Sequence, residues 1–106
     1  MRVAGPRILL SGLATADLRS IVVYTRERWG DRQARRYAKA LGEALRQLRD
    51  RPGLGRVRDE LHAGMRSFPV ASHIVFYREI DAGIAVVRIL HGSMDASHSL
   101  AGLTSP

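Results

Sequence analysis

The sequence predicts an α+β fold: an N-terminal strand, then an α-helical hairpin, then a three-stranded antiparallel sheet. Three observations support this. Apolar residues recur at helical spacing in the first half of the chain. Short runs rich in β-branched and aromatic residues, separated by turn residues, fill the second half. The length of 106 residues suits one hydrophobic core, so we expect a single domain over residues 1–106 with its core at about 7–96.

The first elements are a strand over Arg7–Leu10 and a helix over residues 13–29. Ser11 has the side chain of a helix N-cap, and Asp17 follows near the positive end of the helix dipole. Gly30 ends the helix. The expected buried stripe contains Ala14, Leu18, Ile21, Val22, Thr25 and Trp29.

A second helix is expected from Asp31, as its N-cap, to the Pro52-Gly53 breaker. Its apolar stripe contains Ala34, Tyr37, Ala38, Leu41, Leu45 and Leu48. Because only about two residues separate the two helices, they must pack as an antiparallel hairpin.

The first helix has more than one apolar face, because Ile21 to Tyr24 are consecutive apolar residues. One face can meet the second helix and the sheet, which leaves Val23 and Tyr24 pointing elsewhere. Two explanations stay open at this point. The helix is buried on two sides within its own domain, or the second face is a groove for a partner's helix.

Glycine-containing residues 53–64 are expected to form a loop before the sheet. The predicted strands cover residues 65–70, 72–78 and 84–91. Pro69 makes the first of them an edge strand or marks a bulge, and Ile80–Gly83 forms the hairpin turn between the other two. The small, polar tail from Ser97 is expected to fray.

The composition excludes several classes of site. There is no cysteine, which favours a reducing compartment and excludes thiolate zinc sites and cysteine nucleophiles. The four histidines are scattered, so no metal site is expected. No phosphate-binding loop, dinucleotide motif or hydrolase nucleophile motif occurs, and we expect no cofactor. No apolar run approaches the roughly 20 residues that span a bilayer, so we expect a cytoplasmic protein without a membrane partner.

The net charge of +7 lies entirely in residues 1–53, which hold 12 Lys or Arg and 5 Asp or Glu. Residues 54–106 hold five of each. Arginine binds planar carboxylate and phosphate groups in a bidentate manner, so the excess indicates an acidic partner, either nucleic acid or an acidic protein. The alternative is that these arginines lie on ordinary solvent-exposed helix faces and have no binding role.

Basic and aromatic residues fall on the predicted strands: Arg66, His73, Tyr77, Arg88 and His91. If the strands form a meander, several of them could converge on one face. Such a cluster could hold a phosphate and move a proton, as a metal-free ribonuclease requires. In the alternative, Arg66 and Arg88 are sheet residues that pair with Glu79 or Asp95, and the histidines only cap the ends of the strands.

Short motifs follow one another along the chain: Leu10-Ser11, Ala16-Asp17-Leu18, Tyr24-Thr25, Trp29-Gly30, Gln33-Ala34 through Tyr37, Gly64-Met65-Arg66-Ser67, His73 to Arg78, Arg88-Ile89-Leu90-His91 and Met94-Asp95. Their order and spacing resemble the ParE-type toxins of the RelE/ParE toxin–antitoxin superfamily, over about residues 8–100. The end of the last strand is the most specific part. Gly12 departs from the pattern, because the family often has proline there.

The resemblance implies the toxin of a type II toxin–antitoxin module. RelE-like members cleave mRNA on the ribosome, whereas ParE-like members inhibit DNA gyrase and block replication. Here no tyrosine follows His91, so the ribonuclease set is incomplete and the gyrase inhibitor is favoured. We therefore assign no catalytic residue and no metal ligand. The expected target-binding or phosphate-binding surface contains Arg66, Arg88, His91, Met94 and Asp95.

The resemblance also implies a ParD-like antitoxin, whose disordered C-terminal segment folds over the toxin and whose N-terminal part binds operator DNA. The expected antitoxin-binding residues are the apolar Val23 and Tyr24 and the basic Arg35, Arg36 and Lys39. An exposed sheet edge could accept a strand. A third possibility is a non-toxic module that acts only as a corepressor with its antitoxin.

Overall fold

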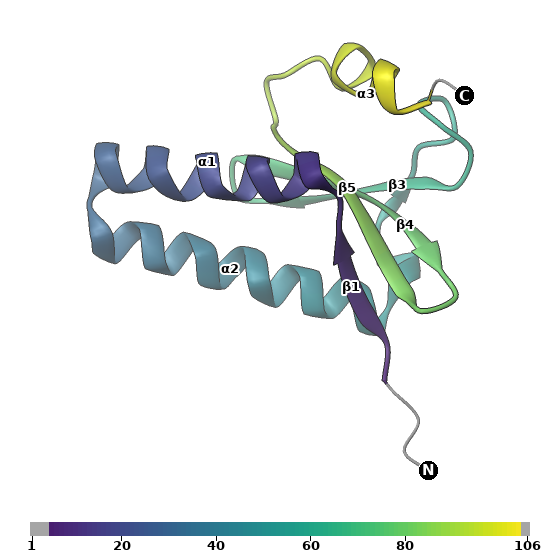
Figure 1. The fold of residues 1–106 in the computed structure, drawn as a ribbon, viewed down its shortest axis with the longest axis horizontal. Coiled ribbons are helices and arrows are strands. Elements are labelled where there is room, and N and C mark those ends of the chain that lie inside the picture. Colours follow the sequence, from purple (N-terminus) through teal and green to yellow (C-terminus); the bar gives the residue numbers. More distant parts are fainter. Residues whose placement is uncertain (1–4, 105–106) are drawn as a thin grey trace.

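A computed structural model describes residues 5–104 (Figure 1). The elements in chain order are β1 (Arg7–Leu10), α1 (Gly12–Trp29), α2 (Asp31–Asp50), the 3₁₀ turn η1 (Pro52–Leu54), β2 (Arg56–Val57), β3 (Met65–Val70), β4 (His73–Ile80), β5 (Gly83–His91) and α3 (Ala96–Thr104). The predicted helical hairpin and the three strands after it are confirmed. No helix within residues 5–104 is long and apolar enough to cross a membrane.

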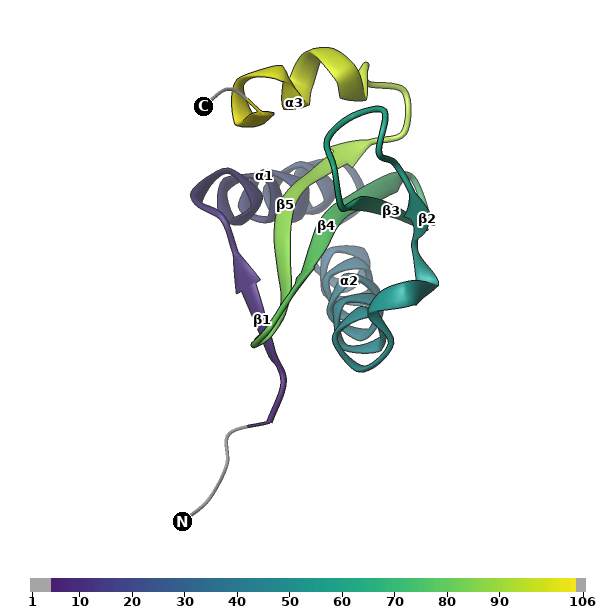
Figure 2. The ribbon, with the colours of Figure 1, turned by 90° about the vertical axis from the view of Figure 1, so that its right-hand side faces the viewer.

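The sheet has five strands in the order β1-β5-β4-β3-β2 (Figure 2). Strands β3, β4 and β5 form the expected antiparallel meander, with Val70 opposite His73 and His73 opposite His91. The N-terminal strand β1 joins the sheet parallel to β5, so β5 lies inside the sheet. The short β2, within the expected loop, covers only part of β3, and Pro69 therefore lies on an edge as predicted.

Helices α1 and α2 cover one face of the sheet and form the main core. Their buried residues pack against alternate residues of β4 and β5, among them Val75, Tyr77 and Ile89. The predicted stripe of α2 is confirmed at Leu41 and Leu48, which are fully buried. Trp29 is an error in the predicted stripe of α1, since its side chain is 66% exposed at the last residue of the helix.

The C-terminal helix α3 covers the other face of the sheet. Leu100 is buried there against Met65, Phe76 and Leu90. The prediction that the chain frays from Ser97 is therefore wrong. A short segment of mostly small and polar residues gives little periodic signal, whereas the contact of Leu100 with the sheet stabilises the helix.

Two caps define the hairpin. The Ser11 hydroxyl accepts a hydrogen bond from the Ala14 amide at 2.9 Å, which confirms the predicted N-cap of α1. Gly30 has a φ of +93°, a conformation that favours glycine, and joins the two helices directly. Gly30 is also the N-cap of α2. The prediction that Asp31 caps this helix is wrong, because Asp31 lies in the first turn and forms an ion pair with Arg26 at 3.0 Å.

Asp17 links α1 to the end of β5. Its carboxylate accepts two hydrogen bonds from the Arg88 guanidinium, at 2.7 and 2.8 Å, and a third from the Ile89 amide at 2.9 Å. The two side chains are only 14% and 17% exposed. Asp17 lies beyond the first turn of α1, so this contact replaces the predicted role at the helix dipole. The alternative pairing of Arg88 with Glu79 or Asp95 is wrong as well. The hydrogen bonds to Asp17 also raise the pKa of Arg88.

Tyr77 and Arg66 fix the connection after α2. The buried Tyr77 hydroxyl donates to the Pro52 carbonyl at 2.6 Å and accepts from the Gly55 amide at 2.8 Å. The Arg66 guanidinium donates to the Gly55 carbonyl at 2.7 Å. Arg66 does not pair with Glu79 or Asp95, contrary to the alternative that the sequence allowed.

The first testable prediction concerns the buried ion pair. Replacing Asp17 with alanine leaves the Arg88 guanidinium without its counter-charge, which should cost about 3 kcal/mol of unfolding free energy. Asp50→Ala is the matched control, because it removes an exposed partner of Arg49 and should cost less than about 1 kcal/mol. Urea unfolding measures both. Equal losses for the two variants would contradict the special role of Asp17.

A second prediction uses two neighbouring glycines. A Cβ atom at Gly55 would collide with the Tyr77 hydroxyl, whereas one at Gly53 meets nothing within 4 Å. Gly55→Ala should therefore destabilise the protein by about 2 kcal/mol, with Gly53→Ala as the control. Thermal unfolding of the two variants tests this. An unchanged midpoint for Gly55→Ala would show that the loop does not depend on Tyr77.

Candidate functional site

The outer face of α1 presents two exposed apolar side chains among polar ones. Val23 is 47% exposed and Tyr24 is 61% exposed, so the explanation that the helix is buried on two sides is wrong for these residues. Together with Arg19, Ser20 and Glu27 they line a shallow hollow of about 320 Å³. An exposed apolar surface of this kind on a helix is typical of a binding site for another chain.

Basic side chains accompany this apolar face on the adjacent helix. Arg35, Arg36 and Lys39 are all exposed on the N-terminal half of α2. The structure therefore places the five residues predicted to bind an antitoxin on the two helices of one hairpin. A hairpin that presents both apolar and cationic side chains suits an acidic amphipathic segment.

A cavity of about 310 Å³ lies where the hairpin meets the ends of β4 and β5. Tyr24 and Trp29 of α1, Tyr37 of α2, His73 and His91 are among its lining residues. The Tyr37 hydroxyl lies 2.5 Å from His73 Nδ1 and also accepts from the Ser72 amide at 3.2 Å. The two imidazole rings are 5.4 Å apart, edge to face. The sequence motifs contained these residues, but only the strand register brings them together.

Two titratable groups that line the cavity, His73 and Tyr37, have shifted pKa values. Burial lowers the pKa of His73 below 6.5, the nearby His91 lowers it further, and the more distant Asp17 raises it. Burial raises the pKa of Tyr37. His73 is consequently held in its neutral form near physiological pH.

The predicted phosphate cluster does not form. Arg66 and Tyr77 lie beside the loop after α2, where both are bonded to backbone groups. His73 and His91 lie opposite each other at the far ends of their strands, and Arg88 is engaged by Asp17. The residues of the predicted cluster therefore lie in three separate places: beside the loop after α2, at the ends of β4 and β5, and in the ion pair with Asp17.

The other residues predicted to bind a target follow β5. His91 is exposed, and its Nδ1 accepts from the Ser93 amide at 3.1 Å. Met94 is 49% exposed in the turn that follows. Asp95 accepts from the His98 amide at 3.3 Å and so caps α3. These three lie together near the end of β5, whereas Arg66 lies two strands away.

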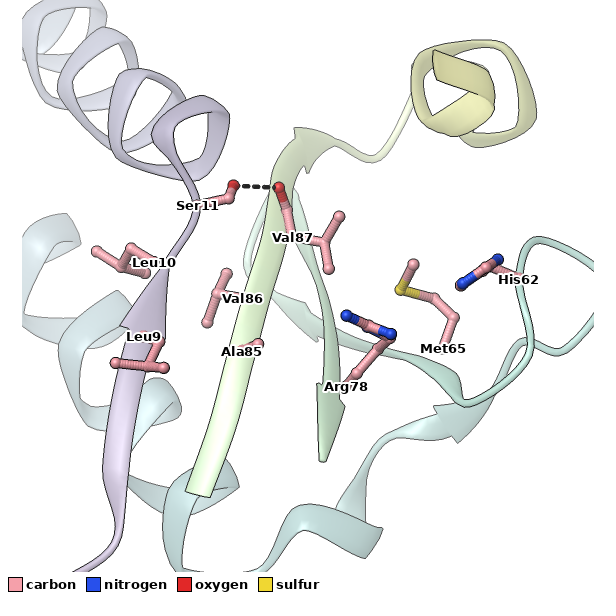
Figure 3. Close-up of a pocket in the computed structure, with 9 residues that line it drawn as sticks. All are labelled: Leu9, Leu10, Ser11, His62, Met65, Arg78, Ala85, Val86 and Val87. Atoms are coloured by element: carbon pink, nitrogen blue, oxygen red, sulfur yellow. Dashed lines mark hydrogen bonds between the residues drawn. The ribbon is translucent and has the colours of Figure 1, made fainter. Parts of the chain in front are cut away.

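A groove that the sequence did not indicate crosses the sheet on the face opposite the hairpin (Figure 3). It has a volume of about 350 Å³ and extends from the exposed Leu9 on β1, past Ala85 and Arg78, to Met65 and His62. Within residues 5–104, the outer edge of β1 pairs with no other strand. The expected exposed sheet edge is therefore present at β1, beside an apolar floor.

No group of three or more histidine, aspartate or glutamate side chains in the described part of the chain could hold a metal ion. What the site offers chemically is an apolar helix face, cationic side chains and two imidazoles. Such groups suit the binding of another macromolecule.

Solved structures show which class of protein has this fold. A chain of the chromosomal ParDE toxin–antitoxin system from P. aeruginosa matches with a TM-score of 0.69, at 19% identity, over 81% of this chain and 95% of that one. A chain of the YoeB–YefM complex from Staphylococcus aureus matches with a TM-score of 0.56, at 19% identity, over 83% of this chain and 98% of that one. The fold is that of the RelE/ParE toxins.

Sequence comparisons then identify the family. The model of the family described as ParE toxin of type II toxin-antitoxin system, parDE, matches residues 8–96. Toxin ParE1 of Caulobacter vibrioides is 40% identical over 82% of this chain and 90% of its own length. Toxin ParE1 of Mycobacterium tuberculosis is 41% identical over 89% of this chain and 97% of its own length. The chain belongs to the ParE toxin family, as its motifs predicted.

A third prediction follows from the neutral His73. Because its pKa is lowered in the fold, the unfolded chain takes up the proton first as the pH falls past about 6.5. This residue therefore lowers the unfolding free energy as the pH falls below about 6.5. His73→Gln should make that fall shallower, whereas His98→Gln should not. Urea unfolding at several pH values tests this, and identical pH profiles for wild type and His73→Gln would contradict it.

Proposed function

We propose that this ParE-family toxin inhibits DNA gyrase, that it does so without catalysing a reaction, and that a ParD-like antitoxin neutralises it. The observation that supports this most is the ParE family match over residues 8–96, together with relatives named Toxin ParE1 at about 40% identity. The proposed toxin domain comprises the whole chain of 106 residues.

The environment of Tyr77 does not support the ribonuclease alternative. Tyr77, the sheet tyrosine nearest Arg66 in the register, is fully buried and uses its hydroxyl in two backbone hydrogen bonds. Burial raises its pKa as well. A hydroxyl in this environment cannot exchange protons with a bound RNA. The absence of a tyrosine after His91 points in the same direction.

The proposed target-binding surface follows the end of β5. Met94 and His91 are exposed there, and Asp95 fixes the start of α3 beside them. Arg88 acts by holding β5 against α1, since its guanidinium is bound to Asp17. Arg66 is a more distant candidate whose NH1 group is used by the loop after α2.

The antitoxin is proposed to bind across the hairpin. Its apolar residues would cover Val23 and Tyr24, and its acidic residues would pair with Arg35, Arg36 and Lys39. The free edge of β1 offers a second place for an extended segment. In this proposal the toxin reaches operator DNA only through the antitoxin.

The fourth prediction tests the target. Purified toxin should abolish the supercoiling of relaxed plasmid by gyrase, and addition of the antitoxin in equal amounts should restore it. A Met94→Ala variant should inhibit at least fivefold more weakly, because it removes an exposed apolar contact. Leu54→Ala is its control, as Leu54 is similarly exposed on η1.

A parallel assay with translating ribosomes separates the alternatives. Cleavage of mRNA that is lost in Arg66→Ala, with normal supercoiling by gyrase, would overturn the proposal in favour of a ribonuclease. Normal supercoiling without mRNA cleavage would favour the non-toxic corepressor.

A further inference from the structure

The cavity at the end of the hairpin is lined by two imidazole rings, each of which uses its Nδ1 atom in a hydrogen bond. A backbone amide can only donate, so His91 Nδ1 accepts from Ser93 and the ring proton lies on Nε2. The Tyr37 hydroxyl accepts from the Ser72 amide at 3.2 Å and shares a hydrogen bond with His73 Nδ1 at 2.5 Å. Nε2 is therefore the nitrogen of His73 that remains for a ligand.

The Nε2 atoms of the two rings are available to a ligand. Neither has a hydrogen-bond partner among the described residues, since the bonds of both rings are made by Nδ1. Both rings line the same cavity. A metal ion would need an unprotonated ring nitrogen, and the acceptor role of His91 Nδ1 leaves the ring proton of His91 on Nε2.

The walls of the cavity define the rest of the ligand. Tyr24 and Trp29 are exposed aromatic side chains at its rim, and Gln33 adds an amide. An anionic group on an apolar stem satisfies both features, since the anion accepts from the imidazoles and the stem lies against the rings. Arg36 is one helical turn from Gln33 and is exposed, which adds positive charge beside the opening.

We propose that this cavity binds an aspartate or glutamate side chain of the antitoxin, through His73 Nε2 and His91 Nε2, and that binding therefore tightens as the pH falls. The proposal rests on the proposed antitoxin and extends its surface, because Tyr24 belongs to both. The net charge of +7 favours an acidic chain as the occupant.

The pH dependence follows from proton linkage. In the free toxin, burial and the neighbouring His91 keep His73 neutral. The other titratable groups that line the cavity with it are Tyr24 on α1 and Tyr37 on α2, and Asp17 on α1 acts from further away. A bound carboxylate stabilises the imidazolium, so binding takes up a proton.

The fifth prediction is tested by titrating the purified antitoxin into the toxin at pH 8 and pH 6 by calorimetry. Wild-type affinity should rise about tenfold on going to pH 6, as expected for one hydrogen bond that becomes charge-assisted. The His73→Gln/His91→Gln double variant should lose this rise. His98→Gln, on α3, is the matched control and should keep it.

A second readout does not depend on the variants folding equally well. NMR titration of the wild-type toxin should show the pKa of His73 higher in the antitoxin complex than in the free protein. An unchanged pKa, or an equal pH dependence in the double variant, would overturn the inference and leave the toxin assignment intact.

Two further outcomes separate the inference from the proposed function. If the antitoxin does not bind the wild-type toxin at either pH, both the inference and the proposed neutralisation fail. If a short DNA duplex raises the pKa of His73 and the antitoxin does not, the cavity belongs to a nucleic-acid surface and the inference is overturned.

Discussion

The contact of Asp17 with Arg88 and Ile89 positions both proposed surfaces. It joins α1, which presents the apolar face, to the end of β5, from which the chain continues into the Met94 turn and α3. β1 pairs with β5 only as far as Val86. Beyond that point Asp17 satisfies the edge amide of Ile89 that a strand would otherwise bond. Burying a charge pair is costly unless the geometry is good, and here both guanidinium bonds are short.

With α1 held against β5 by Asp17, a small domain can present two binding surfaces. The hairpin uses one side of each helix to cover the sheet, which leaves the outer side of α1 available. The same sheet ends bring His73 and His91 under the tip of the hairpin. An antitoxin lying along α1 would therefore reach the imidazole cavity without leaving the apolar face. In our account, neutralisation is the covering of a surface that is already formed in the free toxin.

The parts of the fold that the sequence predicted are those with strong local signals. The apolar stripe of α2, the cap at Ser11 and the meander of β-branched strands are all of this kind. Helix α3 was missed because Leu100 is held by the sheet and not by periodicity. The Asp17–Arg88 pair joins residues 71 positions apart, and no local pattern indicates it. At the candidate site, the sequence allowed two interpretations of Val23 and Tyr24, burial within the domain or exposure to a partner, and it could not decide between them. The cavity depends on strand register, including the irregularity at Phe76/Tyr77, so composition alone could not place His73 beside His91.

The central claim is that an antitoxin covers the exposed face of α1 and the cavity at its end. Hydroxyl-radical footprinting of the toxin, alone and in the antitoxin complex, tests it most directly. We predict that the modification of Tyr24 and Trp29, which are 61% and 66% exposed in the free chain, falls severalfold in the complex. Leu54 should be modified equally in both states. Unchanged modification of Tyr24 and Trp29 in a stable complex would contradict the account.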